Sequence, residues 1–103
     1  MTSVKVKKQH DYITEVVISG HALSNEYGHD VVCAGISSVV TGICNALVEL
    51  TDYDDQLINF KEGYVKLSKL TNDEKVQLII NTLIVQLKTI EHVYSNYIEI
   101  SYL

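Results

Sequence analysis

The spacing of apolar residues in two long segments constrains the fold of this chain more than any other sequence feature. In both segments, apolar residues recur at steps of three and four, which is the period of an amphipathic helix. The first segment covers residues 30–50, with the predicted core stripe Ile36, Val40, Ile43, Leu47 and Leu50. The second covers residues 71–94, with the predicted core stripe Val76, Ile79, Leu83, Leu87 and Ile90. We therefore predict two helices, of which the first is largely buried because it is apolar on more than one face.

The residues at the starts and in the interior of these segments refine the prediction. Asp30 is a favourable N-cap for the first helix. Thr71, with Glu74 three residues later, predicts a capping box at the start of the second. Gly35 and Gly42 each cost about 1 kcal/mol relative to alanine in a helix interior. We expect close packing against another backbone to explain why these glycines are tolerated.

Five short segments predict β-strands, four because apolar and polar residues alternate and residues 12–19 because they are rich in β-branched and aromatic residues. They are residues 3–9, 12–19, 56–60, 64–70 and 97–103. With the helices, the order is ββαββαβ. This order predicts a two-layer α+β domain covering residues 1–103, with both helices packed on one face of a mixed or mostly antiparallel sheet of about five strands.

Charge and composition exclude several functional classes. The formal net charge is −5, and all eight basic residues are lysines. Since phosphate and guanine recognition rely heavily on arginine, we expect no direct binding of nucleic acid. The first ten residues have no apolar signal core, and we find no apolar run of about 18 residues. These features predict a cytoplasmic protein without a membrane segment, and 103 residues leave no room for a separate cofactor domain.

The two cysteines are predicted to have different roles. If Asp30 caps the first helix, Cys33 is the third residue of its first turn, where the free N–H groups and the helix dipole favour a thiolate. Cys44 lies in the middle of the same helix among apolar neighbours and is predicted to be a core residue. A buried, inert Cys33 is the alternative to a nucleophile at this stage.

His21 is the candidate proton-transfer partner of Cys33. It follows Gly20 at the end of the second predicted strand, and an eleven-residue connection can return it to the helix start. Asp30 either orients the imidazole or only caps the helix, and Ser37 either reaches the thiol or bonds back to a helix carbonyl. His29 extends this group to a possible metal set, but the spacing matches no common zinc pattern. We therefore predict no metal or other cofactor, and His21 would form a Cys–His dyad with Cys33 if this cysteine is a nucleophile and not an inert core residue.

The residues around this pair resemble the motif of the ribosomal-processing cysteine protease family, Prp. Gly20, His21 and Ala22 match its Gly-His-Ala strand end. Asp30, Val32, Cys33, Ala34 and Ser37 match its Asp-Ile-Val-Cys-Ala-Ala-x-Ser helix start, with Val31 in place of isoleucine and Gly35 in place of the second alanine. Length, element order and acidic charge also fit, so the resemblance covers essentially the whole chain.

The resemblance implies a cytoplasmic, homodimeric endopeptidase that removes the N-terminal extension of a large-subunit ribosomal protein. It implies His21 and Cys33 as the catalytic dyad, with Asp30 and Ser37 in support. It also implies a mobile substrate loop formed by Ala22, Leu23, Ser24, Asn25, Glu26, Tyr27, Gly28 and His29. Two other hypotheses remain open at this point: a non-catalytic ribosome-associated interaction module and a small metal-binding regulator.

Overall fold

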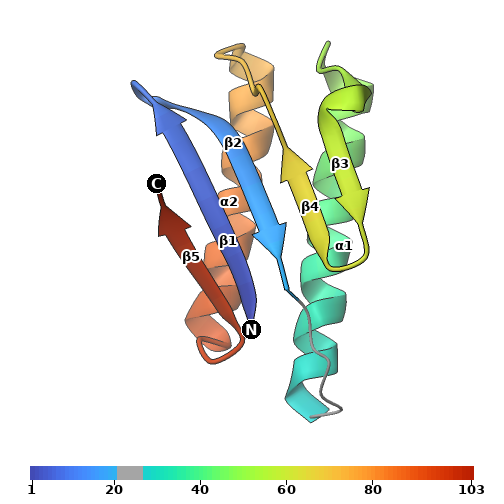
Figure 1. Ribbon diagram of the computed structural model, residues 1–103, viewed down its shortest axis with the longest axis vertical. Coiled ribbons are helices and arrows are strands. Elements are labelled where there is room, and N and C mark those ends of the chain that lie inside the picture. The colour runs from blue at the N-terminus through green and yellow to red at the C-terminus, as the bar shows by residue number, and fades with distance from the viewer. Residues whose placement is uncertain (21–26) are drawn as a thin grey trace.

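The protein is a two-layer α+β structure in which two helices cover one face of a five-stranded sheet (Figure 1). The computed structural model describes the backbone of residues 1–20 and 27–103 and the side chains of residues 1–20 and 31–103. The helices are α1 (Tyr27–Leu50) and α2 (Glu74–Val93). The strands are β1 (Thr2–Gln9), β2 (Tyr12–Ser19), β3 (Ile58–Lys61), β4 (Tyr64–Leu67) and β5 (Ile98–Tyr102), with a short 3₁₀ turn at Asp55–Leu57.

The strands are arranged in the order β3-β4-β2-β1-β5. The β1–β2, β2–β4 and β3–β4 pairs are antiparallel, whereas β1 and β5 are parallel. It follows that β2 and β3 run in one direction and β4 and β5 in the other, so each helix is the crossover between two parallel strands. In Figure 1, α1 lies behind β3 and β4 and α2 behind β1 and β2. The predicted fold class and element order are confirmed.

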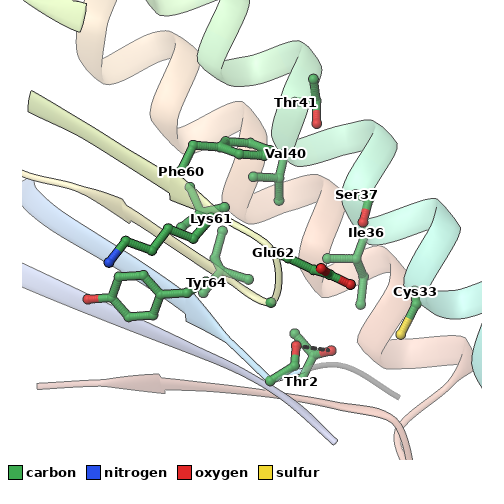
Figure 2. Close-up of a pocket in the computed structure, with 14 residues that line it drawn as sticks. Thr2, Cys33, Ile36, Ser37, Val40, Thr41, Phe60, Lys61, Glu62 and Tyr64 are labelled. Atoms are coloured by element: carbon green, nitrogen blue, oxygen red, sulfur yellow. Dashed lines mark hydrogen bonds between the residues drawn. The ribbon is translucent and has the colours of Figure 1, made fainter. Parts of the chain in front are cut away.

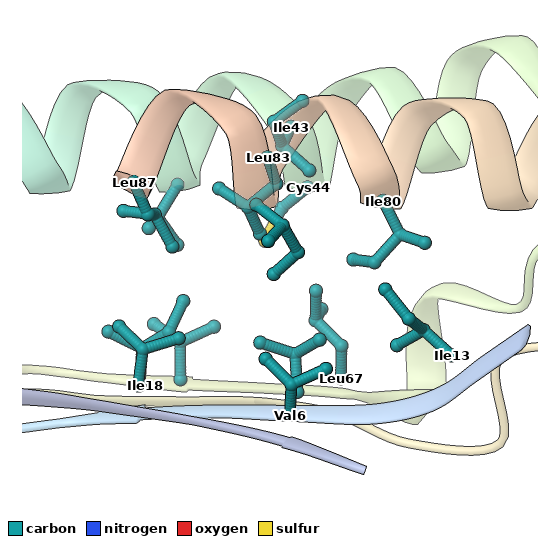
Figure 3. Close-up of a cluster of buried hydrophobic side chains, with 14 of the residues drawn as sticks. Val6, Ile13, Ile18, Ile43, Cys44, Leu67, Ile80, Leu83 and Leu87 are labelled. Carbon is teal, nitrogen blue, oxygen red and sulfur yellow. The ribbon is translucent and has the colours of Figure 1, made fainter. Parts of the chain in front are cut away.

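A continuous apolar core fills the space between the two layers (Figure 3). Its helical part is Val32, Ile36, Val40, Ile43, Cys44 and Leu47 of α1, with Val76, Ile80, Leu83, Ile84 and Leu87 of α2. The strands contribute Val4, Val6, Ile13, Val16, Ile18, Val65, Leu67 and Ile98. Their alternate residues point away from the helices, and this explains the period-two pattern of the sequence.

The structure corrects several predicted boundaries and caps. The C-terminal half of residues 64–70 is not strand: β4 ends at Leu67, and Lys69 has a φ of 52° that no β-strand adopts. The N-cap of α2 is Asp73, whose carboxylate accepts hydrogen bonds from the backbone N–H groups of Lys75 and Val76. The predicted capping box at Thr71 is wrong because its hydroxyl instead accepts from the N–H of Asp73.

The outward face of α1 is more exposed than the sequence predicted. Val31 is 57% exposed and Leu50, assigned to the core stripe, is 64% exposed. A Cβ atom added at Gly35 or Gly42 would meet no atom within 4 Å, so the predicted close approach of another backbone is wrong within this single chain. The helix is therefore buried on one face and open on the other.

One segment of the described residues, Val31–Leu50, is long and apolar enough to cross a membrane by length and composition alone. The prediction that no apolar run reaches this length is therefore wrong for α1. The same segment supplies six core residues that pack against α2 and the sheet. A core helix of a globular protein meets the same criterion, and α1 is such a helix in this fold.

Two buried acidic groups in the core predict a loss of stability at alkaline pH. Burial raises the pKa of the Cys44 thiol from 9.0 to about 11 and, as the main cause, that of Tyr53 from 10.0 to about 12. The unfolded chain releases these protons at lower pH than the folded chain, so the free energy of unfolding falls as pH rises above about 9. We expect the urea midpoint to decrease between pH 9 and 11, and to decrease less in Cys44→Ala; equal slopes would contradict this assignment.

Candidate active site

A groove runs between the N-terminal half of α1 and the turn that joins β3 to β4 (Figure 2). Its volume is about 400 Å³ and most of its lining surface is apolar. Helix α1 contributes Cys33, Ile36, Ser37, Val40 and Thr41. The sheet side contributes Thr2, Ile18, Gly20, Phe60, Lys61, Glu62, Gly63, Tyr64 and Val65. An open apolar trough of this kind suits an extended chain segment better than a compact polar molecule.

Cys33 lies at one end of this groove, with its sulfur directed into it (Figure 2). Its side chain is partly exposed, whereas Cys44 is 6% exposed and belongs to the core. Neither thiol is part of a disulfide. The predicted contrast between a core cysteine and an accessible one is therefore confirmed. Ser37, one helical turn after Cys33, also lines the groove, as expected for residues four apart on a helix.

The end of β2 is fixed beside the same groove by Gly20. The N–H of Gly20 donates a 2.9 Å hydrogen bond to the carbonyl of Gly63 in the β3–β4 turn, and its carbonyl accepts from the Thr2 hydroxyl at 3.5 Å. Gly20 and Cys33 both line the groove, and Gly20 is the residue directly before His21. The chain therefore leads to His21 from the cavity that contains the thiol. His21 itself, and Ala22 to Glu26, lie outside the described residues.

Gly20 has a backbone conformation that few other residues can adopt. Its φ is +88°, and a Cβ atom there would lie 2.6 Å from the backbone oxygen of Met1. We expect Gly20→Ala to lower thermal stability by several degrees and to reduce catalytic activity more than tenfold, because strain at this point displaces the strand end. Ser19→Ala is the neighbouring control. Unchanged activity and melting temperature in Gly20→Ala would contradict the role of this contact.

The start of α1 differs from the prediction. The helix begins at Tyr27, so Asp30 is its fourth residue, not its N-cap, and Cys33 is its seventh residue. The last three residues of the predicted substrate loop, 27–29, are helical as well. Asp30 suggested a cap because aspartate favours that position, but an acidic residue is also stabilising inside the first turn. Since the dipole effect falls off after the first turn, the predicted first-turn activation of Cys33 does not apply.

The wall opposite Cys33 was not anticipated from the sequence. Phe60 and Glu62 come from β3 and the following turn, about 30 residues beyond the cysteine. They reach the groove because β4 pairs with β2, which places the β3–β4 turn next to the end of β2. The turn residues Lys61, Glu62 and Gly63 were recognisable, but their position next to β2 depends on long-range strand pairing.

A metal centre has no support among the side chains that the structure describes. Within residues 1–20 and 31–103, no three His, Cys, Asp or Glu side chains are grouped closely enough to hold an ion. The side chains of His21, His29 and Asp30 are outside these ranges. The chemistry that the described part of the groove offers is that of a thiol beside an apolar channel.

A partly exposed cysteine at the end of an open apolar groove is consistent with the class of cysteine proteases. Residues 1–99 match the family model of cysteine protease Prp. The ribosomal processing cysteine protease Prp of Staphylococcus aureus is 42% identical over 96 residues, covering 87% of each chain. That of Bacillus subtilis is 32% identical over 108 residues, covering 98% of this chain and 96% of the relative. The chain belongs to the cysteine protease Prp family.

Solved structures agree with this assignment along the full chain. A crystal structure of the ribosomal processing protease Prp from S. aureus with a substrate peptide has a TM-score of 0.89 and 36% identity. A second, with a covalently linked product peptide, has a TM-score of 0.87 and 37% identity. Each comparison covers all of both chains. The chain therefore shares its fold with enzymes whose structures contain bound peptides.

Proposed function

We propose that this chain is a single-domain endopeptidase that removes the N-terminal extension of a large-subunit ribosomal protein by means of a Cys33–His21 dyad. The observation that carries the proposal is the position of Cys33 at the end of an apolar groove that is also lined by Gly20, the residue before His21. The names of its relatives give the substrate class, ribosomal processing. The peptide complexes of the S. aureus enzyme support an extended peptide as the occupant of the groove.

The proposed reaction uses two proton transfers and no cofactor. The Cys33 thiolate attacks the carbonyl carbon of the scissile bond and forms a tetrahedral oxyanion. His21 then protonates the leaving amine, and a thioester to Cys33 remains. Water, deprotonated by His21, attacks the thioester carbonyl, the C–S bond breaks, and the Cys33 thiolate and protonated His21 are regenerated with release of the carboxylic acid product. Backbone N–H groups near Cys33 stabilise the oxyanion in both halves of the reaction.

Asp30 and Ser37 are proposed to support the dyad. Ser37 lines the groove one turn after Cys33, so its hydroxyl can contact the bound peptide or the thiol. Asp30 is on the same helix, one turn before Cys33, and is proposed to orient the imidazole. Residues 22–29 are proposed to close over the bound peptide, with the part from Tyr27 onward belonging to the helix in the form described.

We also propose that the enzyme is a cytoplasmic homodimer whose copies meet on the outer face of the helices. This face exposes Val31 and Val48 of α1 together with Leu78 and Val85 of α2. The open space above Gly35 and Gly42 would let a partner helix approach closely. Sedimentation equilibrium should give twice the chain mass of 11.6 kDa. A mass of one chain at micromolar concentration would contradict the dimer.

Peptide cleavage tests the proposed activity. The purified chain is incubated with a peptide that spans the N-terminal extension and mature start of the ribosomal protein, and products are identified by mass spectrometry. We expect one cut at the boundary, absent from His21→Ala and from a peptide with scrambled extension sequence. Binding of the peptide without any cut would instead favour the non-catalytic interaction module.

A further inference from the structure

Glu62 occupies a fixed position at the mouth of the groove, opposite the helix that carries Cys33. It belongs to the turn between β3 and β4, where Lys61 pairs with Tyr64 across the hairpin. The next residue, Gly63, has a φ of 73° and accepts the hydrogen bond from the N–H of Gly20. This bond ties the turn to the end of β2, so the backbone of Glu62 cannot move independently of the groove.

The side chain of Glu62 extends from the turn toward α1, over Ile36 and in the direction of Cys33 (Figure 2). The side chain of Lys61 leaves the turn on the other side, alongside that of Tyr64 (Figure 2). These are the two charged residues of the described lining, and only the carboxylate faces the cavity. The charge that this part of the wall presents to a bound peptide is therefore negative.

The carboxylate of Glu62 has no cation to balance it within the described part of the chain. The ion pair between Lys66 and Glu15, 3.6 Å apart, is the one found among those residues, and it lies on the opposite face of the sheet. Apart from Lys61, the other described side chains that line the groove are apolar or carry a hydroxyl or thiol group, so none of them neutralises the carboxylate. Glu62 is solvent-exposed, so a cation on a bound peptide can reach its carboxylate and pair with it by a charge-assisted hydrogen bond.

We propose that Glu62 is a specificity-determining residue that selects peptides with a lysine or arginine at one position of the segment held in the groove. The inference rests on the proposed function, because it assumes that the groove holds the substrate peptide. A cationic side chain at that position pairs with Glu62, whereas a neutral or acidic one leaves the carboxylate unpaired or repelled. The selection is thus by charge, in addition to the apolar fit supplied by Ile36, Val40 and Phe60.

A positioning role toward His21 is the competing explanation, and it makes different predictions. A carboxylate that orients the imidazole would affect every substrate equally and would shift the pH profile of kcat. A carboxylate that binds a cationic side chain of the substrate would change KM for cationic peptides and would leave the shape of the pH profile unchanged. The ratio between two substrates separates these roles, because it cancels any general change in activity.

The test is a lysine scan of a cleavable peptide. Lysine is placed at one position at a time in an otherwise uncharged peptide that spans the scissile bond, and kcat/KM is compared with that of the uncharged parent. For the wild type we expect one position at which lysine raises kcat/KM about tenfold, mainly through KM. In Glu62→Gln this ratio should fall to about one, and in Glu62→Lys the preference should reverse toward glutamate. Glu99→Gln, which removes the same charge from β5, is the matched control and should keep the wild-type ratio.

Three results would overturn the inference. They are a tenfold lysine preference that persists in Glu62→Gln, the absence of any position-specific preference in the wild type, and an altered pH profile with unchanged ratios. If the wild type cleaves no peptide at all, the proposed function fails first. The same ratios are then measured as dissociation constants by fluorescence anisotropy with Cys33→Ala, with and without Glu62→Gln. Equal affinities for the lysine and parent peptides would overturn the charge selection independently of catalysis.

Discussion

Replacing Cys33, the proposed nucleophile, with alanine should reduce peptide cleavage by a factor of about 10⁴ or more, because only binding and oxyanion stabilisation would then remain. Cys33 is the thiol that lines the groove, and its removal leaves Ile36 and Val40 in place to bind peptide. We therefore expect the loss in kcat, with the peptide dissociation constant changed by less than about threefold. Single-turnover kinetics and equilibrium binding measure the two quantities separately.

Cys44 provides the matched control for this experiment. It is on the same helix but buried in the core, and burial raises the pKa of its thiol. Cys44→Ala should keep kcat within a few-fold of the wild type while lowering stability. Iodoacetamide at pH 8 should modify Cys33 first, with loss of activity in step with the modification. Cleavage by Cys33→Ala at the wild-type rate would refute the assignment of the nucleophile.

Leu83→Ala should have the largest effect on stability, at about 2–5 kcal/mol. Leu83 is fully buried in the middle of α2 and belongs to the same apolar core as Ile43 and Cys44 of α1 (Figure 3). Truncation to alanine removes apolar contacts with both layers. It leaves a cavity that the surrounding helices and sheet cannot close. The expected loss is a large part of the total of about 5–15 kcal/mol for a domain of this kind.

Leu78, on the exposed side of the same helix, is the control for Leu83. It is 69% exposed, so Leu78→Ala should change the free energy of unfolding by no more than about 0.5 kcal/mol. Urea denaturation at pH 7 measures both variants. Leu83→Val, a smaller truncation, should lie between them and provides a value if Leu83→Ala does not fold. Equal midpoints for Leu78→Ala and Leu83→Ala would show that the core is not where the structure places it.

The sequence was sufficient for the elements and their order because each has a strong local pattern. Residues 12–19 are rich in β-branched and aromatic residues and form β2 with the predicted bounds, and the apolar steps of Leu83 and Leu87 identify the inward face of α2. Leu50 was assigned to the core on the same periodicity but is exposed, because the C-terminal end of α1 extends beyond the part of the helix that packs on the sheet. The apolar period shows which face of a helix is buried, but it does not show where the layer that covers this face ends.

The site was predictable only in part, for a related reason. Cys33 stands out because a local motif surrounds it, and the groove confirms that its thiol is accessible. Phe60 and Glu62 have no local signal, since their place opposite Cys33 depends on the pairing of β2 with β4. The start of α1 was misplaced by three residues because Gly28 disfavours a helix, whereas Asp30 is favourable both as an N-cap and within the first turn.

The N-terminal residues of the chain carry a practical consequence for work with this enzyme. Thr2 is 3% exposed and lines the groove, and the backbone of Met1 lies against Gly20. Leu103 lies beyond β5, at the far edge of the sheet from β3 (Figure 1). An affinity tag or fusion partner joined ahead of Met1 would emerge beside the groove that contains the Cys33 thiol and would obstruct it. Purification handles and fluorescent reporters therefore belong after Leu103.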